Sequence, residues 1–410
     1  MNQPNYGAIL FFLSRYRFLY GAILVMAMAT SVLEAFSVVA FFPLFTAMLG
    51  DAQENTGGIA GVSIKLSGYL PMSSALAGAA LLLGAAFLVK TVGILFRDLL
   101  VAYAGAKIHY DVKQQVMEQY SGAEYQFIVD NQQGTLIYGS LAAPGSVIIL
   151  HTTLALMVIS SMKMVAIGAV LVSLLPYPAL AFMGMALFYY MTMHQISKKI
   201  TFTLAQKRVA ANQDQDIIAN EFLNGFRQIV SFNIQKRWIS RFEQANRIDC
   251  EVFAKQMAWQ SVPRPLLELA AMALLLGFVL FLKTANPDTF TEHLAGLGIF
   301  AVALVQILPS LSTFGGSRLA LMASLPNVQL AHETITISVP ARLEGNRVLP
   351  SFEKSIAFEK VSFSHEGRGS LMDQVDMTFE KGKVTAIVGP SGSGKTTLIN
   401  LILGLFQPTD

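Results

Sequence analysis

Six long apolar runs constrain this chain more than any other feature of its sequence. A helix that spans a bilayer needs about 20 apolar residues, and no water inside the bilayer can satisfy a non-helical backbone. Hydrophobic residues make up 53% of the chain and charged residues only 13%, against about 25% charged in an average soluble domain. We therefore expect a mostly α membrane protein. The predicted spans are residues 18–49, 72–97, 147–162, 164–191, 266–282 and 294–314.

Polar residues and prolines mark the turns between these spans. A tight turn at residues 160–163 separates the third predicted span from the fourth, and Pro176 and Pro178 are expected to kink the fourth. Two segments, about 105–140 and 197–263, are polar yet helical in pattern, which predicts long helix extensions into water. The second is rich in Lys and Arg, so the positive-inside rule places these loops and both termini in the cytoplasm.

The composition changes after the sixth span and predicts a second domain. We expect residues 1–337 to form the transmembrane domain, residues 338–352 a linker, and residues 353–410 the N-terminal part of a cytoplasmic domain. Alternating apolar residues at 356–363 predict a strand, and the runs 377–379 and 384–388 around Lys381 and Gly382 predict a hairpin.

Charge, cysteine content and the N-terminus exclude several other classes of protein. The formal net charge of +3 is too small to indicate a nucleic-acid partner. Cys250 is the only cysteine, which excludes a disulfide framework and a cysteine-based metal site. The first apolar run lacks a small-residue cleavage signature, so we expect it to remain as a membrane anchor.

A phosphate-binding motif follows the predicted hairpin and fits the P-loop pattern G-x-x-x-x-G-K-[ST]. Glycines let the backbone curl so that several N–H groups point at a phosphate, while Lys395 adds a cation and Thr396 a hydroxyl for Mg²⁺. We therefore predict an ATP and Mg²⁺ site. Its residues are Gly389, Pro390, Ser391, Gly392, Ser393, Gly394, Lys395, Thr396 and Thr397.

The sequence around this motif distinguishes it from an ordinary Gly-rich turn. Residues 383–388 predict a buried strand before the loop, and residues 398–406 predict an apolar helix after it. Strand, loop and helix thus follow in the order that phosphate binding at a helix N-terminus requires.

The order of these parts resembles the ABC exporters, in which six transmembrane helices are fused to a nucleotide-binding domain. The resemblance includes residues 124–134 and 221–230, which look like the two intracellular loops of that family. It implies a six-helix exporter transmembrane domain followed by a truncated α/β P-loop NTPase domain. It also implies a homodimer whose two loops carry coupling helices, the second of which docks on the partner subunit's domain.

Two departures from the family pattern limit what the resemblance carries. An aromatic residue that stacks on adenine is usual after the first strand, and His365 stands at the matching position. An imidazole can stack on a base, but a surface histidine in a turn is an equal alternative. The family's signature motif, catalytic glutamate and switch histidine would lie beyond Asp410, so the catalytic residues stay unknown. We expect this chain to bind ATP without hydrolysing it.

Glu34 is the candidate residue for the substrate pathway. An ionisable residue within a span costs about 2.5 to 3.5 kcal/mol on insertion scales, which marks it as a functional candidate. Glu34 lies near the middle of the first span, whereas Lys90 and Arg97 are expected near the cytoplasmic face. The alternative is a structural carboxylate that is neutral or paired with a neighbouring helix.

The leading hypothesis is an ATP-driven exporter or flippase in a bacterial inner membrane, which works by alternating access. Residues 308–312, together with 33–35 and 42–44, look similar to lipid-linked oligosaccharide flippases and to polysaccharide or peptide exporters. We therefore expect an amphipathic or lipid-like substrate. One alternative is a membrane-anchored ATP-binding protein that gates, senses or scaffolds without transport; another is a membrane-bound kinase or other P-loop enzyme.

Overall fold

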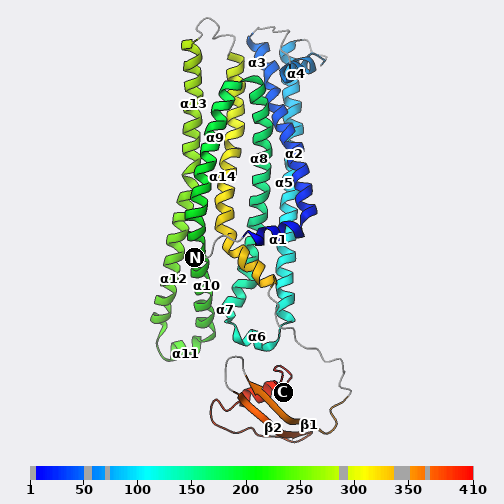
Figure 1. Cartoon of the computed structure of the whole chain (residues 1–410), viewed down its shortest axis with the longest axis vertical. Helices are drawn as coiled ribbons and strands as arrows, with labels where there is room; N and C mark the ends of the chain where they lie inside the picture. The colour runs from blue at the N-terminus through cyan, green and yellow to red at the C-terminus, as the bar shows by residue number, and fades with distance from the viewer. Residues whose placement is uncertain are drawn as a thin grey trace.

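Long helices that run side by side dominate the architecture. The computed structural model describes residues 6–49, 58–69, 74–285, 294–336, 351–364 and 370–409. The helices along the long axis are α2 (Arg17–Val39), α3 (Phe41–Leu49), α5 (Ala75–Ser121), α8 (Ala143–Leu174), α9 (Pro176–Ile196), α10 (Phe202–Asn224), α12 (Gln235–Ser261), α13 (Pro263–Ala285) and α14 (Leu294–Thr336) (Figure 1).

Shorter helical segments connect these long helices or lie at their ends. Helix α1 (Gly7–Arg15) lies across the bundle, and α4 (Gly58–Gly68) lies beside its upper end (Figure 1). Helices α6 (Tyr125–Asp130), α7 (Gln133–Ile137) and α11 (Phe226–Ser231) lie at the lower end. Two π-helical segments, η1 (Tyr138–Ala142) and η2 (Ser197–Thr201), join α7 to α8 and α9 to α10.

The transmembrane domain has the predicted mostly α, six-helix fold. Five described helical segments are long and apolar enough to cross a membrane, by length and composition. Helix α9 forms the remaining pass beside them (Figure 1). Its two prolines and several polar residues lower its mean hydropathy, which explains why it is less apolar than the other five.

The predicted boundary between the third and fourth spans is wrong. Helix α8 continues through residues 160–163 and ends at Leu174. The helical conformation is interrupted at Leu175, which has φ −141° and ψ 76°. Pro176 and Pro178 therefore begin α9 instead of kinking it. A proline is well tolerated in the first turn because its missing N–H would have no intrahelical partner there. Lys163 consequently lies inside α8 and not in a turn.

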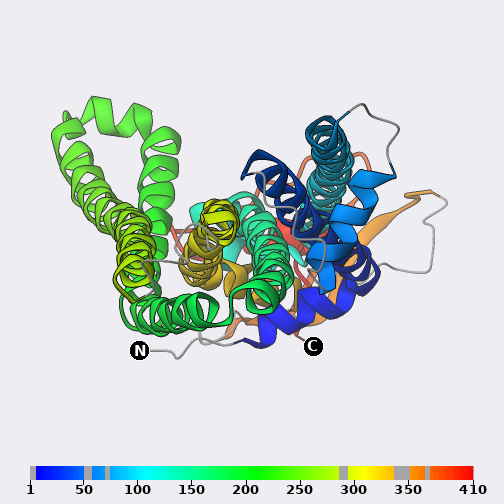
Figure 2. The ribbon, with the colours of Figure 1, turned by 90° about the horizontal axis from the view of Figure 1, so that it is seen from above.

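Helices α8 and α14 lie at the centre of the packing. One buried cluster joins α1, α5, α8 and the lower part of α14, and a second joins α2, α8, α9 and the upper part of α14. Half of the apolar window of α2 is buried within the chain, but only 11% of the window in the α12–α13 segment is. From above, α10 to α13 form an arm at one side of the molecule, which joins the other helices through α7, α9 and α14 (Figure 2).

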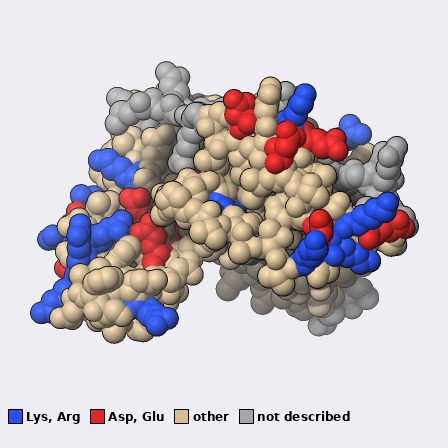
Figure 3. Space-filling view, turned by 90° about the horizontal axis from the view of Figure 1, so that it is seen from below, with Lys and Arg blue, Asp and Glu red and all other residues tan. Residues whose placement is uncertain are grey.

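The second polar segment forms a helical hairpin, α10–α11–α12, as its helical pattern predicted. Viewed from below, Lys and Arg side chains gather over this part of the molecule (Figure 3). This clustering matches the basic composition that placed the hairpin in the cytoplasm.

The C-terminal part contains a two-stranded antiparallel sheet and one helix. Strand β1 (Ser355–Ser364) pairs with β2 (Ser370–Glu380), so that Ile356 lies opposite Phe379. The predicted hairpin around Lys381 and Gly382 is wrong, because the strand partner of 377–379 is β1 and not 384–388. Of the linker predicted at 338–352, residues 338–350 lie outside the described residues, so the domain boundaries stay predictions.

The strand predicted at 383–388 is also wrong. These residues form no strand, and Val384 and Val388 are almost fully exposed. A β-branched run of this kind is stabilised by strands on both sides, and the described part of the chain supplies none there. After them, helix α15 (Lys395–Ile402) begins inside the P-loop motif and ends four residues before the predicted helix end at Phe406.

Candidate functional site

The P-loop has the backbone conformation that the motif predicted. Gly392 and Gly394 have φ of 85° and 86°, in the left-handed region that side chains disfavour. A Cβ at Gly389 would lie 2.8 Å from Ser393 Oγ, so a larger residue there would require the Ser393 hydroxyl to move. Gly394 immediately precedes α15, whose first N–H groups lack intrahelical acceptors and carry a partial positive charge. The loop therefore presents donors to an anion.

Lys395 is folded back onto this loop. Its Nζ donates hydrogen bonds to the carbonyl oxygens of Gly389, at 2.9 Å, and Pro390, at 2.7 Å. Thr396 is exposed beside it, whereas Thr397 is buried against the helix. The residues present fit Mg²⁺-ATP, since Gly392 and Gly394 shape a phosphate cradle, Lys395 supplies a cation and the Thr396 hydroxyl is accessible to a metal ion.

The other residues predicted to contact the nucleotide are Ser391, Ser393 and His365. Ser391 and Ser393 are exposed on the same loop, close to Lys395 in sequence. His365 lies outside the described residues, so its stacking on adenine stays a prediction.

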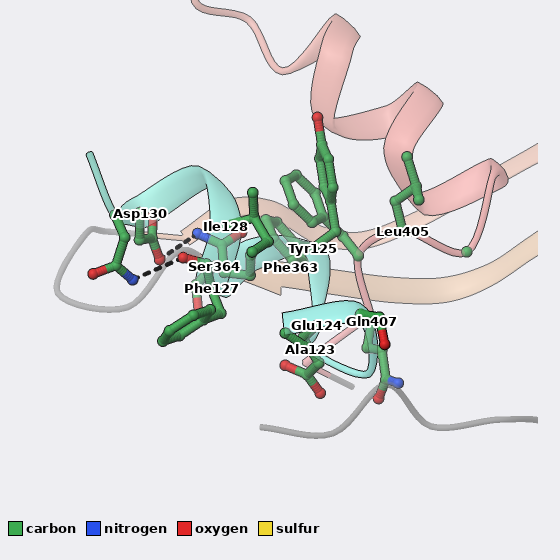
Figure 4. Close-up of a pocket in the computed structure, with 15 residues that line it drawn as sticks. Ala123, Glu124, Tyr125, Phe127, Ile128, Asp130, Phe363, Ser364, Leu405 and Gln407 are labelled. Carbon is green, nitrogen blue, oxygen red and sulfur yellow. Dashed lines mark hydrogen bonds between the residues drawn. The ribbon is translucent and has the colours of Figure 1, made fainter. Parts of the chain in front are cut away.

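Helix α6 contacts the P-loop domain. The Tyr125 ring lies 5.7 Å from the Phe406 ring, which is itself stacked on Phe363 of β1 at 5.4 Å. A cavity of about 490 Å³ separates the rest of α6 from β1 and from the segment after α15. Figure 4 shows Tyr125 and Phe127 on one side of it and Phe363, Leu405 and Gln407 on the other. This contact physically connects the first cytoplasmic loop with the segment that follows the P-loop helix.

Helix α11 presents apolar side chains to solvent. Leu223 is 72% exposed and Phe226 is 53% exposed, and Phe232 just beyond the helix is also exposed. Ile229 is buried and holds the short helix in the hairpin. Exposed aromatic and aliphatic side chains grouped in this way are typical of an interaction surface.

Glu34 belongs to a buried ion cluster. Its side chain is almost fully buried, with Lys163 Nζ of α8 at 3.0 Å from Oε2 and Arg97 Nη1 of α5 at 3.9 Å from Oε1. Arg97 also donates to Thr30 Oγ1 at 3.3 Å and pairs with Asp98 at 3.0 Å. The expectation of a carboxylate paired with neighbouring helices is therefore correct, while its role in a substrate pathway stays a prediction.

We expected Lys90 and Arg97 near the cytoplasmic face, but this expectation is wrong. Both side chains lie at the level of Glu34. Lys90 Nζ donates to Ser37 Oγ at 3.3 Å and to Gln306 Oε1 of α14 at 3.4 Å. These partners could not be found from the sequence alone. A carboxylate in one span predicts a cation in another span. Several Lys and Arg residues could pair with Glu34, however, and Lys163 was predicted to lie in a turn.

Comparisons with known proteins agree with this geometry. The family model for the ABC transporter transmembrane region matches residues 20–284, and the model for the ABC transporter matches residues 372–410. The first match covers more than half of the chain, so the chain belongs to the ABC transporter family, as an exporter-type half-transporter.

The curated relatives that the chain resembles include a flippase and an ATP-binding protein. It is similar to the ATP-dependent lipid A-core flippase of Alkalilimnicola ehrlichii, with 25% identity over 78% of this chain and 54% of the relative. It is also similar to the heterocyst differentiation ATP-binding protein HepA of Nostoc sp., with 29% identity over 49% of this chain and 32% of the relative. The chain thus spans about a third to a half of the length of these curated relatives.

A solved structure supports the fold. A bacterial Atm1-family ABC exporter with ATP bound superimposes with a TM-score of 0.69 over 95% of this chain and 67% of that chain, at 16% identity. At this identity the similarity carries the fold alone.

Proposed function

We propose that this chain is part of an ATP-driven exporter that moves an amphipathic or lipid-like substrate across a bacterial inner membrane. The contact between Tyr125 of α6 and Phe406 carries the proposal, because it joins the P-loop domain to helices that belong to the transmembrane bundle. A membrane protein that only held ATP would not need such a contact. The relatives named as lipid A-core flippases support a lipid-like substrate for this chain.

Two copies would form the working transporter. The exposed side chains of α11 and the low burial of the α12–α13 segment support a second copy as the partner. In such a dimer, α11 docks on the partner's P-loop domain while α6 contacts its own. Closure of the two P-loop domains then moves the long helices, so that the substrate cavity between the transmembrane helices opens to the outside.

The residues of this chain bind and orient the nucleotide. Gly392 and Gly394 would direct backbone N–H groups at the phosphates, Lys395 would turn from the loop carbonyls to phosphate oxygens, and Thr396 would hold Mg²⁺. Mg²⁺-ATP would supply the free energy for closing the dimer and, after hydrolysis, for reopening it. Hydrolysis itself also requires a residue that positions the attacking water.

Nucleotide binding by the 410-residue chain tests the first part of this proposal. A fluorescent ATP analogue should bind in the presence of Mg²⁺, and Lys395→Ala should weaken binding by about tenfold or more. Lys381→Ala, at an exposed lysine in the same domain, is the matched control. Equal binding by all three chains would sink the nucleotide assignment, and ATPase activity that Lys395→Ala abolishes would contradict the expectation of binding without hydrolysis.

Transport requires a chain that includes the whole nucleotide-binding domain. In proteoliposomes, ATP on the side of the P-loop should move fluorescent lipid between the leaflets, and Lys395→Ala should stop this movement. ATP hydrolysis without movement of any tested lipid or peptide would favour the membrane-anchored ATP-binding role instead.

A further inference from the structure

Polar side chains from four helices meet inside the apolar bundle. Helix α2 carries a buried polar stripe at Thr30, Glu34 and Ser37, spaced so that all three lie on one face. Cations reach this stripe from α5 and from α8, and Gln306 reaches it from α14. Viewed from above, α2, α5, α8 and α14 stand together on one side of the molecule (Figure 2). We call the set Glu34, Ser37, Lys90, Arg97, Lys163 and Gln306 the polar cluster.

The polar cluster lies well inside the bilayer. Lys90 is 15 residues along α5 from its first residue, Ala75 (90 − 75), and Glu34 is 17 residues along α2 from Arg17 (34 − 17). At about 1.5 Å per residue these positions are about 22 Å and 26 Å from the respective helix starts. Neither group is placed to reach an aqueous boundary easily, so its charge must be compensated within the protein or by a bound molecule.

Cations outnumber carboxylates in the cluster. Lys163 and Arg97 share the single buried carboxylate of Glu34, and Arg97 has a second partner in Asp98, whose side chain is mostly exposed. Lys90 donates to a hydroxyl and an amide oxygen and lies over the Phe87 ring at 4.5 Å, but among the described residues no carboxylate lies within ion-pair distance of its ammonium.

The excess positive charge has a physical cost that an anion would remove. A charged side chain in a span costs about 2.5 to 3.5 kcal/mol unless it is compensated. In a purely structural cluster, pairing each cation with one carboxylate, as Lys163 pairs with Glu34, would lower this free-energy cost. Lys90 and Lys163 also keep part of their side chains accessible, whereas Glu34 and Arg97 are buried. Lys90 and Lys163 are therefore the cluster's cations that an approaching molecule can contact.

From these observations we infer that the polar cluster binds an anionic group of the substrate, with the chemistry of a phosphate monoester, through Lys90 and Lys163. Glu34 does not contact the anion; it pairs with Lys163 and Arg97 and so competes with the anion for their positive charge. This inference rests on the proposed export function and specifies that the amphipathic substrate carries an anionic headgroup.

Binding measured without nucleotide tests the inference separately from transport. The 410-residue chain in detergent is titrated with dioctanoyl phosphatidic acid and with dioctanoyl phosphatidylcholine, each carrying the same fluorescent tail, and polarisation gives both affinities. The readout is the ratio of the two affinities, because a general loss of folding or of apolar contact lowers both. We expect phosphatidic acid to bind at least about tenfold more tightly, a difference of about 1.4 kcal/mol.

The variants have opposite expected signs. Lys90→Met should bring the affinity ratio close to one, and Lys90→Arg should restore it because it returns the charge. Glu34→Gln should raise the ratio because it removes the competing anion, whereas a purely structural Glu34 would leave the ratio unchanged. Lys283→Met, at an exposed lysine of α13, is the control for general attraction between cations and phosphatidic acid.

Competition identifies the source of the anion. If glycerol 3-phosphate or inorganic phosphate displaces the probe, the anion is a soluble phosphate; if only acylated competitors do so, it is a lipid headgroup. Both outcomes support an anion site. A ratio that Lys90→Met leaves unchanged, or lowers no more than Lys283→Met does, overturns it. Charge-selective binding without ATP-dependent lipid movement would instead contradict the proposed function and leave the site in place.

Discussion

Helices α6 and α11 are both six residues long and both lie at the lower ends of long helices in Figure 1, but they differ in what they contact. Tyr125 of α6 lies against Phe406 in the P-loop domain of the same chain. Phe226 of α11 and its neighbour Leu223 are largely exposed. The difference teaches that, among the described residues, the same chain supplies an aromatic partner for α6, whereas the apolar surface at α11 stays exposed. A surface of this kind is typical of an interaction site.

Replacing Gly134 should have the largest effect, because it changes the crossing between the two loops. A Cβ at Gly134 of α7 would lie 2.6 Å from the Cα of Ile217 in α10, so even Gly134→Ala must push the helices apart. Overpacking of this kind costs about 1–3 kcal/mol or more. Thermal unfolding of the detergent-solubilised chain should show a clearly lower midpoint.

Gly122→Ala is the control for this prediction. Its Cβ would lie 3.6 Å from the Glu118 carbonyl oxygen, an ordinary contact, in a right-handed backbone conformation. If both alanine variants unfold at the same temperature, the close packing of α7 on α10 does not exist in solution.

Removal of the Tyr125 ring should loosen the covered loop. An aromatic pair contributes about 0.5–1.5 kcal/mol beyond its buried area, so Tyr125→Ala should increase amide hydrogen exchange in α6 by about twofold to tenfold. A double-mutant cycle with Phe406→Ala isolates the contact, because its coupling energy should be positive and of similar size. Independent, additive effects of the two substitutions would show that α6 and the P-loop domain do not touch.

The corresponding change in α11 should leave the single chain almost unaffected. Phe226→Ala removes an exposed ring, so its effect on the unfolding free energy of one chain should stay within about 0.5 kcal/mol. In a chain that includes the whole nucleotide-binding domain, the same substitution should weaken self-association, which sedimentation in detergent can measure. A large loss of stability in the isolated chain would show that α11 is covered within one molecule after all.

The smallest predicted effect concerns pH and the arm of the hairpin that carries α11. Burial raises the pKa of the Asp216 carboxyl above its usual value of 3.8, because it disfavours the charged form. The folded chain therefore holds this proton more tightly than the unfolded chain, so stability falls as the pH rises from about 3.8 through the raised pKa and then stays level. Asp216→Asn should remove this loss.

Unfolding midpoints of Asp216→Asn and of the unsubstituted chain, measured from pH 4 to pH 8, test this prediction. The advantage of the variant should grow as the pH rises. Asp214→Asn, on an exposed residue of the same helix, is the control. A constant difference across the pH range would mean that Asp216 does not titrate differently in the folded chain.

The sequence was sufficient where a single helix or loop determines its own conformation. The apolar runs predicted the membrane passes, because a spanning helix satisfies its own backbone, and the glycines of the motif predicted a tightly curled loop, which the positive φ angles of Gly392 and Gly394 fit. The motif also identified Lys395 and Thr396 as the residues beside the phosphate cradle.

The sequence was insufficient where a residue depends on a distant partner. Lys163 was predicted to lie in a turn because local hydropathy contains no information about contacts between helices. Glu34, in another helix, stabilises Lys163 inside α8. The pairing of β2 with β1 instead of 384–388 has the same origin, since neighbours in a sheet are chosen by the whole fold. The exposed run at 383–388 kept its strand-like sequence, but a strand of this kind forms only beside other strands.

The two hydrogen bonds from Lys395 to the carbonyl oxygens of Gly389 and Pro390 make the loop a competitor for its own lysine. In the proposed nucleotide complex, phosphate oxygens compete with these two carbonyl oxygens for the Lys395 ammonium, which lowers the expected affinity. Any contact that pulls the Pro390 carbonyl away from Lys395 would therefore tighten ATP binding without touching ATP. The geometry of this loop makes nucleotide affinity adjustable from outside the nucleotide site.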